Sequence, residues 1–413
     1  MRIAAVILGA LLLLAGAGAA APAPAFTWQA AWVTATQRPG DSFNWSTSGF
    51  GNQSVRQVIR VSAEGSTLRL RLSNRFGTQP LVVTGATIAR SAGGAALYPD
   101  SLQPLTIGHE FTFRIDTGAE AVTDPVALPV AMLEELTVTL YFADATGPAT
   151  YHALTPNTSY LAWDDHRADS TGEAFAVTST SFYYLDAVEV ADSHPHRPAV
   201  ALFGDSFTEG VGSTRDQHNA YPDQLAELLL AQDRRRAVLN LGINGNCVIA
   251  DSQWLGEGGL TRFQRDVLDR PGVGTVVILQ GINDIWVGGA NLALGPLTGG
   301  LSAEQVIEGL RGLIAQARAG GLRVIGATIA PVGRSTFDSG DRARFADREG
   351  VRRAVNDWIR GSGEYDAVAD IATVLADPAA TDRLAAVYDI GDHLHPNDAG
   401  HAAMAAAVAA VLD

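Results

Sequence analysis

Serine, histidine and aspartate residues of this chain stand at spacings that suit nucleophilic catalysis. Ser206 follows an apolar run within Gly204-Asp205-Ser206, and Asp392 precedes His395 by three residues. A serine hydroxyl becomes a nucleophile when a base takes its proton, and the base needs an acceptor on its other ring nitrogen. At this spacing Asp392 can accept from Nδ1 of His395 and leave Nε2 facing Ser206. The pattern predicts a triad, although a serine at such a turn is more commonly a helix N-cap.

His393 is the alternative base. It directly follows Asp392, so the side chains of these two residues are expected to diverge. His395 comes before a predicted helix, whose positive end favours the neutral imidazole that a base must be. We therefore favour His395 over His393.

The attacked carbonyl develops a negative oxygen, which needs donors already in place. Gly245 offers a backbone N–H without a side chain in the way, and Asn283 offers a neutral amide. Each has a structural alternative, a turn that needs positive φ for Gly245 and a loop cap for Asn283. Their occurrence at the same predicted edge as Ser206 favours an oxyanion hole.

Five apolar runs in the C-terminal half predict buried parallel strands, because helical stretches separate them. The predicted strands are Ala199–Phe203, Ala237–Leu241, Val273–Leu279, Leu322–Ile329 and Ala367–Ile371. The predicted helices are Tyr221–Gln232, Leu260–Leu268, Ala303–Ala319 (with Ser302 and Gln305 as a capping box), Arg344–Arg360 and a last one after Asn397. This order predicts a flavodoxin-like, doubly wound α/β sheet, in which ligands bind beyond the carboxyl ends of the strands.

The N-terminal half has a different pattern, in which short β-rich runs alternate with turns. They are Arg56–Val61, Thr67–Leu72, Leu81–Ile88, Phe111–Ile115 and Leu136–Phe142. The pattern predicts an all-β sandwich over residues 26–190, a linker over 191–197 and a catalytic domain over 198–413. The linker holds His194 and His196, but without a nearby cluster of ligands a solvated linker is favoured over a metal site.

Four segments resemble, in order, blocks I, II, III and V of the SGNH/GDSL hydrolase family. They are Gly204-Asp205-Ser206, the segment around Gly245, Gly281-Ile282-Asn283-Asp284 and Asp392-His393-Leu394-His395. The resemblance covers residues 198–413 and implies Ser206 as nucleophile, His395 as base and Asp392 as its orienting partner. It also implies the Ser206 N–H, the Gly245 N–H and the Asn283 side chain as oxyanion donors. Phe207 departs from the family's usual leucine. The sandwich in front resembles a subgroup that includes acetylxylan-esterase-like proteins.

Composition limits the other classes of function. The 413 residues are 47% hydrophobic and 18% charged, which describes a globular protein. A formal net charge of −15 argues against binding to nucleic acid or to anionic lipid. Arg2, the apolar run Ile3–Leu14 and the small residues up to Ala21 predict a cleaved signal peptide over residues 1–21. We therefore expect a secreted or periplasmic protein without a membrane span after cleavage. Cys247, the single cysteine, reads as a buried small hydrophobe.

These features predict a secreted serine esterase that needs no cofactor or metal. The leading substrate is an O-acetyl ester on carbohydrate. The alternatives are a lipase- or thioesterase-like hydrolase of other small esters, or a carbohydrate-binding protein with an inert hydrolase domain. Trp254 and Trp286 follow the second and third loops, where either could stack on a sugar ring, although packing is the commoner role. The sequence leaves the oligomeric state open.

Overall fold

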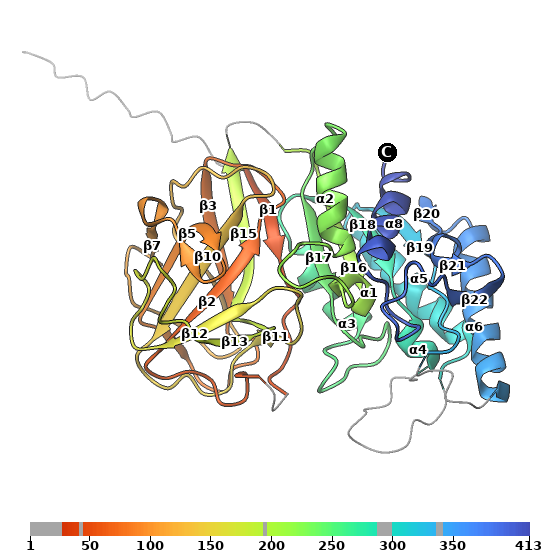
Figure 1. The fold of residues 1–413 in the computed structure, drawn as a ribbon, viewed down its shortest axis with the longest axis horizontal. Coiled ribbons are helices and arrows are strands. Elements are labelled where there is room, and N and C mark those ends of the chain that lie inside the picture. The colour runs from red at the N-terminus through yellow and green to blue at the C-terminus, as the bar shows by residue number, and fades with distance from the viewer. Residues whose placement is uncertain (1–26, 41–43, 193–195, 287–299, 336–341) are drawn as a thin grey trace, which may run out of the picture.

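A computed structural model describes residues 27–40, 44–192, 196–286, 300–335 and 342–413. An all-β region and an α/β region lie side by side (Figure 1). The predicted signal peptide over residues 1–21 lies outside the described residues, as do residues 193–195 of the predicted linker. Within the described ranges, no helix is both long and apolar enough to cross a membrane.

Two antiparallel sheets form the N-terminal region, and their apolar side chains share one core. The first sheet has the order β1 (Thr27–Val33), β15 (Leu185–Asp192), β3 (Thr67–Ser73) and β9 (Glu120–Val122). The second has the order β13 (Val177–Ser179), β12 (Ser159–Trp163), β2 (Gln53–Arg60), β10 (Glu135–Phe142), β5 (Gly85–Gly93) and β6 (Ala96–Leu97), with β7 (Gln103–Leu105) also paired to β5. Short pairs join β4 (Leu81–Val83) to β8 (Phe113–Ile115) and β11 (Tyr151–His152) to β14 (Phe182–Tyr183). A 3₁₀ turn spans Pro99–Ser101. The predicted sandwich is confirmed.

Two details of the sequence prediction are wrong in this region. The predicted strand Leu81–Ile88 is two strands, because the chain bends at Thr84: β4 before the bend pairs with β8, and β5 after it pairs with β10. At this bend the Arg167 guanidinium lies so close to Gly85 that a Cβ there would sit 1.4 Å from it. The linker also begins later than predicted, since Asp192 still pairs with Thr27 as part of β15.

The C-terminal region contains the predicted five-stranded parallel sheet with helices. Its strand order is β17 (Val238–Gly242), β16 (Ala199–Gly204), β18 (Val273–Leu279), β19 (Arg323–Ala327) and β20 (Ala367–Ala369). The α-helices are α1 (Ser206–Glu209), α2 (Tyr221–Ala231), α3 (Gly259–Phe263), α4 (Ile282–Trp286), α5 (Ala303–Ala319), α6 (Arg342–Gly361), α7 (Ile371–Leu375) and α8 (Asp398–Ala409). A π-helical turn η2 (Gln264–Leu268) continues α3, so the helix predicted over Leu260–Leu268 is only partly α-helical. A hairpin of β21 (Ala376–Asp377) and β22 (Ala380–Leu384) precedes the last loop. The Ser302–Gln305 capping box is present.

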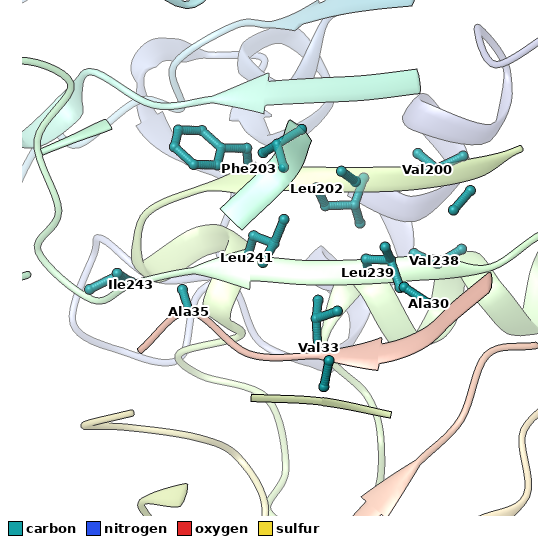
Figure 2. Packing of buried hydrophobic residues seen from close by; sticks show 14 of the residues in the cluster. Ala30, Val33, Ala35, Val200, Leu202, Phe203, Val238, Leu239, Leu241 and Ile243 are labelled. Carbon is teal, nitrogen blue, oxygen red and sulfur yellow. The ribbon is translucent and has the colours of Figure 1, made fainter. Parts of the chain in front are cut away.

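The two regions share an apolar interface along β1 and β17. Figure 2 shows Ala30, Val33 and Ala35 of the N-terminal region packed beside strand β17 of the parallel sheet. Ser62 caps the outer edge of β17: its Oγ accepts from the Val238 N–H at 2.9 Å. The buried ion pair between Arg270 and Asp186 crosses the same interface. Because apolar burial and a buried ion pair join them, the sandwich and the parallel sheet form one packed unit.

Candidate active site

Ser206 is the first residue of α1, directly after the carboxyl end of β16. The N-cap of this short helix is Asp205, whose carboxylate accepts from the Phe207 N–H at 3.2 Å. Ser206 is therefore not the capping residue, and the N-cap alternative for it is wrong. Burial raises the pKa of Asp205 to about 7. Only 5% of Ser206 is exposed, so its hydroxyl faces a largely dry environment.

His395 lies between Ser206 and Asp392. Its Nδ1 is 2.7 Å from Oδ2 of Asp392, and its Nε2 is 3.1 Å from Oγ of Ser206. An ionised carboxylate only accepts, so Nδ1 carries the proton and Nε2 accepts from the Ser206 hydroxyl. The arrangement leaves His395 ready to take the serine proton.

The carboxylate of Asp392 is fixed on both of its oxygens. Oδ1 accepts from the N–H groups of Leu394 and His395, each at 2.8 Å. Partial burial would raise the pKa of Asp392, but hydrogen bonds from the His395 backbone, the His395 ring and Leu394 lower it overall. Asp392 is therefore held ionised, as an orienting partner must be.

His393 points elsewhere. Its backbone has a left-handed φ of 61°, and its Nδ1 lies 2.6 Å from Oδ2 of Asp389. The expected divergence of His393 from Asp392 is thus what the structure shows. His395 does not directly adjoin the positive end of a helix, as the sequence suggested. Helix α8 begins at Asp398 with Asn397 as its N-cap, and Pro396 separates His395 from that N-cap.

Gly245 lies in the loop that follows β17. Its φ is +74°, and a Cβ at this position would come within 2.7 Å of Leu255. Glycine is therefore required both by the backbone angle and by the neighbouring side chain. The loop is tied to the nucleophile strand, since the Ile243 N–H donates to the Gly204 carbonyl at 3.2 Å.

Asn283 lies in α4, beyond the carboxyl end of β18, and is 6% exposed. Its Nδ2 donates to the backbone oxygen of Asn246 at 3.0 Å, which places the amide beside the Gly245 loop. The next residue, Asp284, accepts from the N–H groups of Val248 and Ile249 at 2.8 and 3.2 Å. These contacts bring the block II and block III segments together.

Sequence reasoning missed a buried arginine that joins the loops. The Arg262 guanidinium donates to the carbonyls of Gly204 and Leu241, each at 2.9 Å, and to Asn246 Oδ1 at 3.0 Å. Burial lowers the pKa of Arg262 to about 10, although Asp266, at 3.1 Å, opposes this. The charged side chain therefore holds the ends of β16 and β17 at the site. Arg262 and Asp266 stand four residues apart in a predicted helix, but charged pairs at this spacing usually lie on a solvated face.

The two tryptophans differ in their surroundings. Trp254 is 40% exposed, and Gly40 from the sandwich lies against part of its ring. Trp286 is 2% exposed and stacks on Phe345 with ring centroids 5.2 Å apart. Trp286 therefore has the packing role that is commoner for such tryptophans, and its ring is too buried for the alternative role of stacking on a sugar. Cys247 is buried, as expected. Over the described ranges, no group of three or more His, Cys, Asp or Glu side chains is arranged to hold a metal ion.

Comparison with known proteins identifies the family of the C-terminal region. A sequence model of the GDSL-like lipase/acylhydrolase family matches residues 202–403. A search of curated proteins found no match. Among solved structures, a GDSL-like lipase from Bacteroides thetaiotaomicron is similar at 16% identity, covering 51% of this chain and 85% of that one, with a TM-score of 0.37. An acetyl xylan esterase has 21% identity over 51% of this chain and 97% of its own, with a TM-score of 0.37. The aryl esterase of M. smegmatis has 15% identity over 52% and 97%, with a TM-score of 0.36.

The family match spans all four segments that carry the polar loops, from the end of β16 to α8. Those loops meet at the carboxyl edge of a five-stranded parallel sheet in the order expected of the SGNH fold. The C-terminal half of this chain is a GDSL-like lipase/acylhydrolase domain of the SGNH hydrolases, and the protein is a carboxylic ester hydrolase.

Proposed function

We propose that the protein hydrolyses small carboxylic esters through an acyl-enzyme on Ser206, and that O-acetyl groups on carbohydrate are its substrates. The observation that carries the chemistry is the continuous set of contacts from Asp392 through His395 to the Ser206 hydroxyl. His395 takes the Ser206 proton as Oγ attacks the ester carbonyl, and then gives that proton to the leaving alcohol. A water molecule, activated by the same imidazole, releases the acid.

The oxyanion of each tetrahedral intermediate would be bound by the Ser206 N–H, the Gly245 N–H and the Asn283 amide. Two observations support this assignment. Gly245 is held in a conformation that suits glycine alone, and Asn283 is anchored to the same loop through Asn246. Nδ2 of Asn283 has two hydrogens, so the bond to Asn246 leaves the second for substrate.

A cleft beside the Gly245 loop supports a carbohydrate leaving group. Its volume is about 690 Å³, and both regions of the molecule line it. Hydroxyl, amide, guanidinium and indole groups are present, among them Gln37, Asn44, Ser181, Arg215, Asn244 and Trp254. Leu154 and Leu255 add apolar surface to this lining. Polar groups that can bind sugar hydroxyls, together with a partly exposed indole that can stack on a sugar ring, support a carbohydrate. Extracellular glycans would also fit the signal peptide predicted over residues 1–21.

An ester panel tests the substrate. Aryl esters from acetyl to octanoyl should be hydrolysed fastest at the acetyl end, and acetylated xylan should release acetate. Trp254→Ala should raise KM for the polysaccharide while leaving an aryl acetate unaffected, because the small ester does not reach the cleft. A preference for octanoyl esters, without acetate release from xylan, would favour a lipase-like enzyme instead.

A further inference from the structure

A buried histidine–glutamate pair joins the sandwich to the helix that carries Ser206. His152 belongs to β11, and Glu209 is the last residue of α1. Nε2 of His152 lies 3.1 Å from Oε1 of Glu209, and the two residues are only 5% and 2% exposed. The other ring nitrogen, Nδ1, is 2.8 Å from the Ala35 carbonyl oxygen. Two ionisable side chains so deeply buried are costly unless they interact, so the contact is a structural requirement.

Glu209 also joins the nucleophile helix to β17. Its backbone packs directly on β17, since a Cβ on Gly242 would lie 2.1 Å from the Glu209 nitrogen. Asn240 donates from Nδ2 to the Glu209 carbonyl oxygen at 3.3 Å. These two backbone contacts connect the end of α1 to β17, the strand that leads into the loop with the Gly245 N–H.

The hydrogen positions on His152 follow from its partners. A carbonyl oxygen only accepts, so Nδ1 carries a hydrogen and donates to Ala35. Burial would lower the pKa of His152, but the hydrogen bond and the charge of Glu209 outweigh it, and the pKa is raised. Nε2 then faces the Glu209 carboxylate at 3.1 Å as its ion-pair partner, which holds that carboxylate in place from the sandwich side.

We propose that His152 is a positioning residue for ester hydrolysis: it fixes Glu209, and with it the short helix α1 that begins at Ser206, against β17 and the Gly245 loop. This inference rests on the proposed roles of Ser206 and Gly245. It gives the sandwich a part in catalysis, because a side chain from β11 holds the end of the helix that carries Ser206. Displacing an oxyanion donor weakens binding of the transition state more than binding of the ester, so kcat is the affected parameter.

Paired variants test the proposal on the full-length protein with an aryl acetate. His152→Phe and Glu209→Leu should each lower kcat by about ten- to hundredfold and change KM by less than about threefold. Glu209→Gln should retain most of kcat, because its NH₂ group can donate to Nε2 of a neutral His152 and so keep the two side chains in contact. His152→Gln should likewise be milder than His152→Phe.

His218 supplies a matched control. It contacts Glu135 of the sandwich, Nε2 to Oε1 at 2.6 Å, across the same interface. His218→Phe should lower the melting temperature and leave kcat unchanged. Equal kcat for the His152 and His218 variants, or equal losses for Glu209→Gln and Glu209→Leu, would overturn the proposal. Should His152→Phe not fold, the Glu209 pair decides alone. An active Ser206→Ala variant would instead overturn the proposed function itself.

Discussion

The loop between β22 and α8 holds two aspartate–histidine pairs, Asp389 with His393 and Asp392 with His395, whose nitrogen–oxygen distances are 2.6 and 2.7 Å. Their surroundings differ. The His393 side chain is 48% exposed, whereas that of His395 is 14% exposed and reaches the Ser206 hydroxyl. A carboxylate beside an imidazole is thus not enough to define a base. The third group, which the fold brings from 189 residues away, makes the difference.

Replacing the two histidines should give the largest contrast. His395→Ala removes the base and should lower kcat/KM by at least about 10³-fold, whereas His393→Ala should cost at most about tenfold. Both variants should be assayed with an aryl acetate and checked by circular dichroism. A greater loss in His393→Ala would mean that the base has been assigned to the wrong histidine.

The two aspartates should repeat the contrast with smaller effects. Asp392→Asn keeps the shape but spoils the tautomer of His395, so kcat should fall on the order of 10²-fold, between the two histidine variants. Asp389→Asn keeps an oxygen that accepts from the Gly391 and His393 N–H groups and weakens only the contact with the His393 ring, so it should have little effect on kcat. Matching losses in both asparagine variants would indicate that the loop, rather than the triad, determines the rate.

His401 on α8 is a third histidine to compare with His393 and His395. Backbone groups, rather than an aspartate, contact both of its ring nitrogens. Nδ1 accepts from the Tyr221 N–H at 3.3 Å, and Nε2 lies 3.2 Å from the Val211 oxygen. Burial lowers the pKa of His401 to about 4, below the 6.5 of an exposed histidine. The native state therefore binds fewer protons than the unfolded state between these values, so stability falls as pH drops from 6.5 to 4.

The contribution of His401 to this loss should be about 3 kcal/mol. It can be measured as the difference in unfolding free energy between wild type and His401→Gln at pH 7 and at pH 4. The raised pKa of Asp205 acts in the opposite direction, so the variant, not the wild-type curve alone, is informative. Parallel pH curves for the two proteins would contradict the assignment.

Chelation should have the smallest effect. If both aspartate–histidine pairs hold protons rather than a metal ion, dialysis against EDTA should leave kcat and KM unchanged. Loss of activity that zinc restores would show that at least one pair binds metal.

The sequence predicted the site residues that follow predicted strands. Ser206, Gly245 and Asn283 each come after a strand whose end could be located from apolar periodicity, and parallel strands bring such ends to one edge. His395 was predicted from its spacing to Asp392 instead, since α7, β21 and β22 separate it from β20. The boundaries of α5 were also predicted, since Ser302 and Gln305 mark its start.

Contacts between the sandwich and the parallel-sheet region could not be recognised from a local sequence pattern. His152 and Glu209 lie 57 residues apart in different regions of the molecule, and neither belongs to a recognised motif or a periodic run. The exposure of Trp286 could not be read from its position after a strand, because burial depends on Phe345 in a helix far along the chain. A local sequence pattern does not encode the packing of elements that are far apart in the chain.

The most direct test of the central claim is to identify the residue that an aryl phosphonate modifies. We expect one phosphonyl group per chain, mapped by peptide mass spectrometry to Ser206, and little labelling of Ser206→Ala or His395→Ala. Loss of esterase activity should follow the extent of labelling. Labelling of another residue, or hydrolysis above about a thousandth of the wild-type kcat in folded Ser206→Ala, would contradict the assignment of the nucleophile.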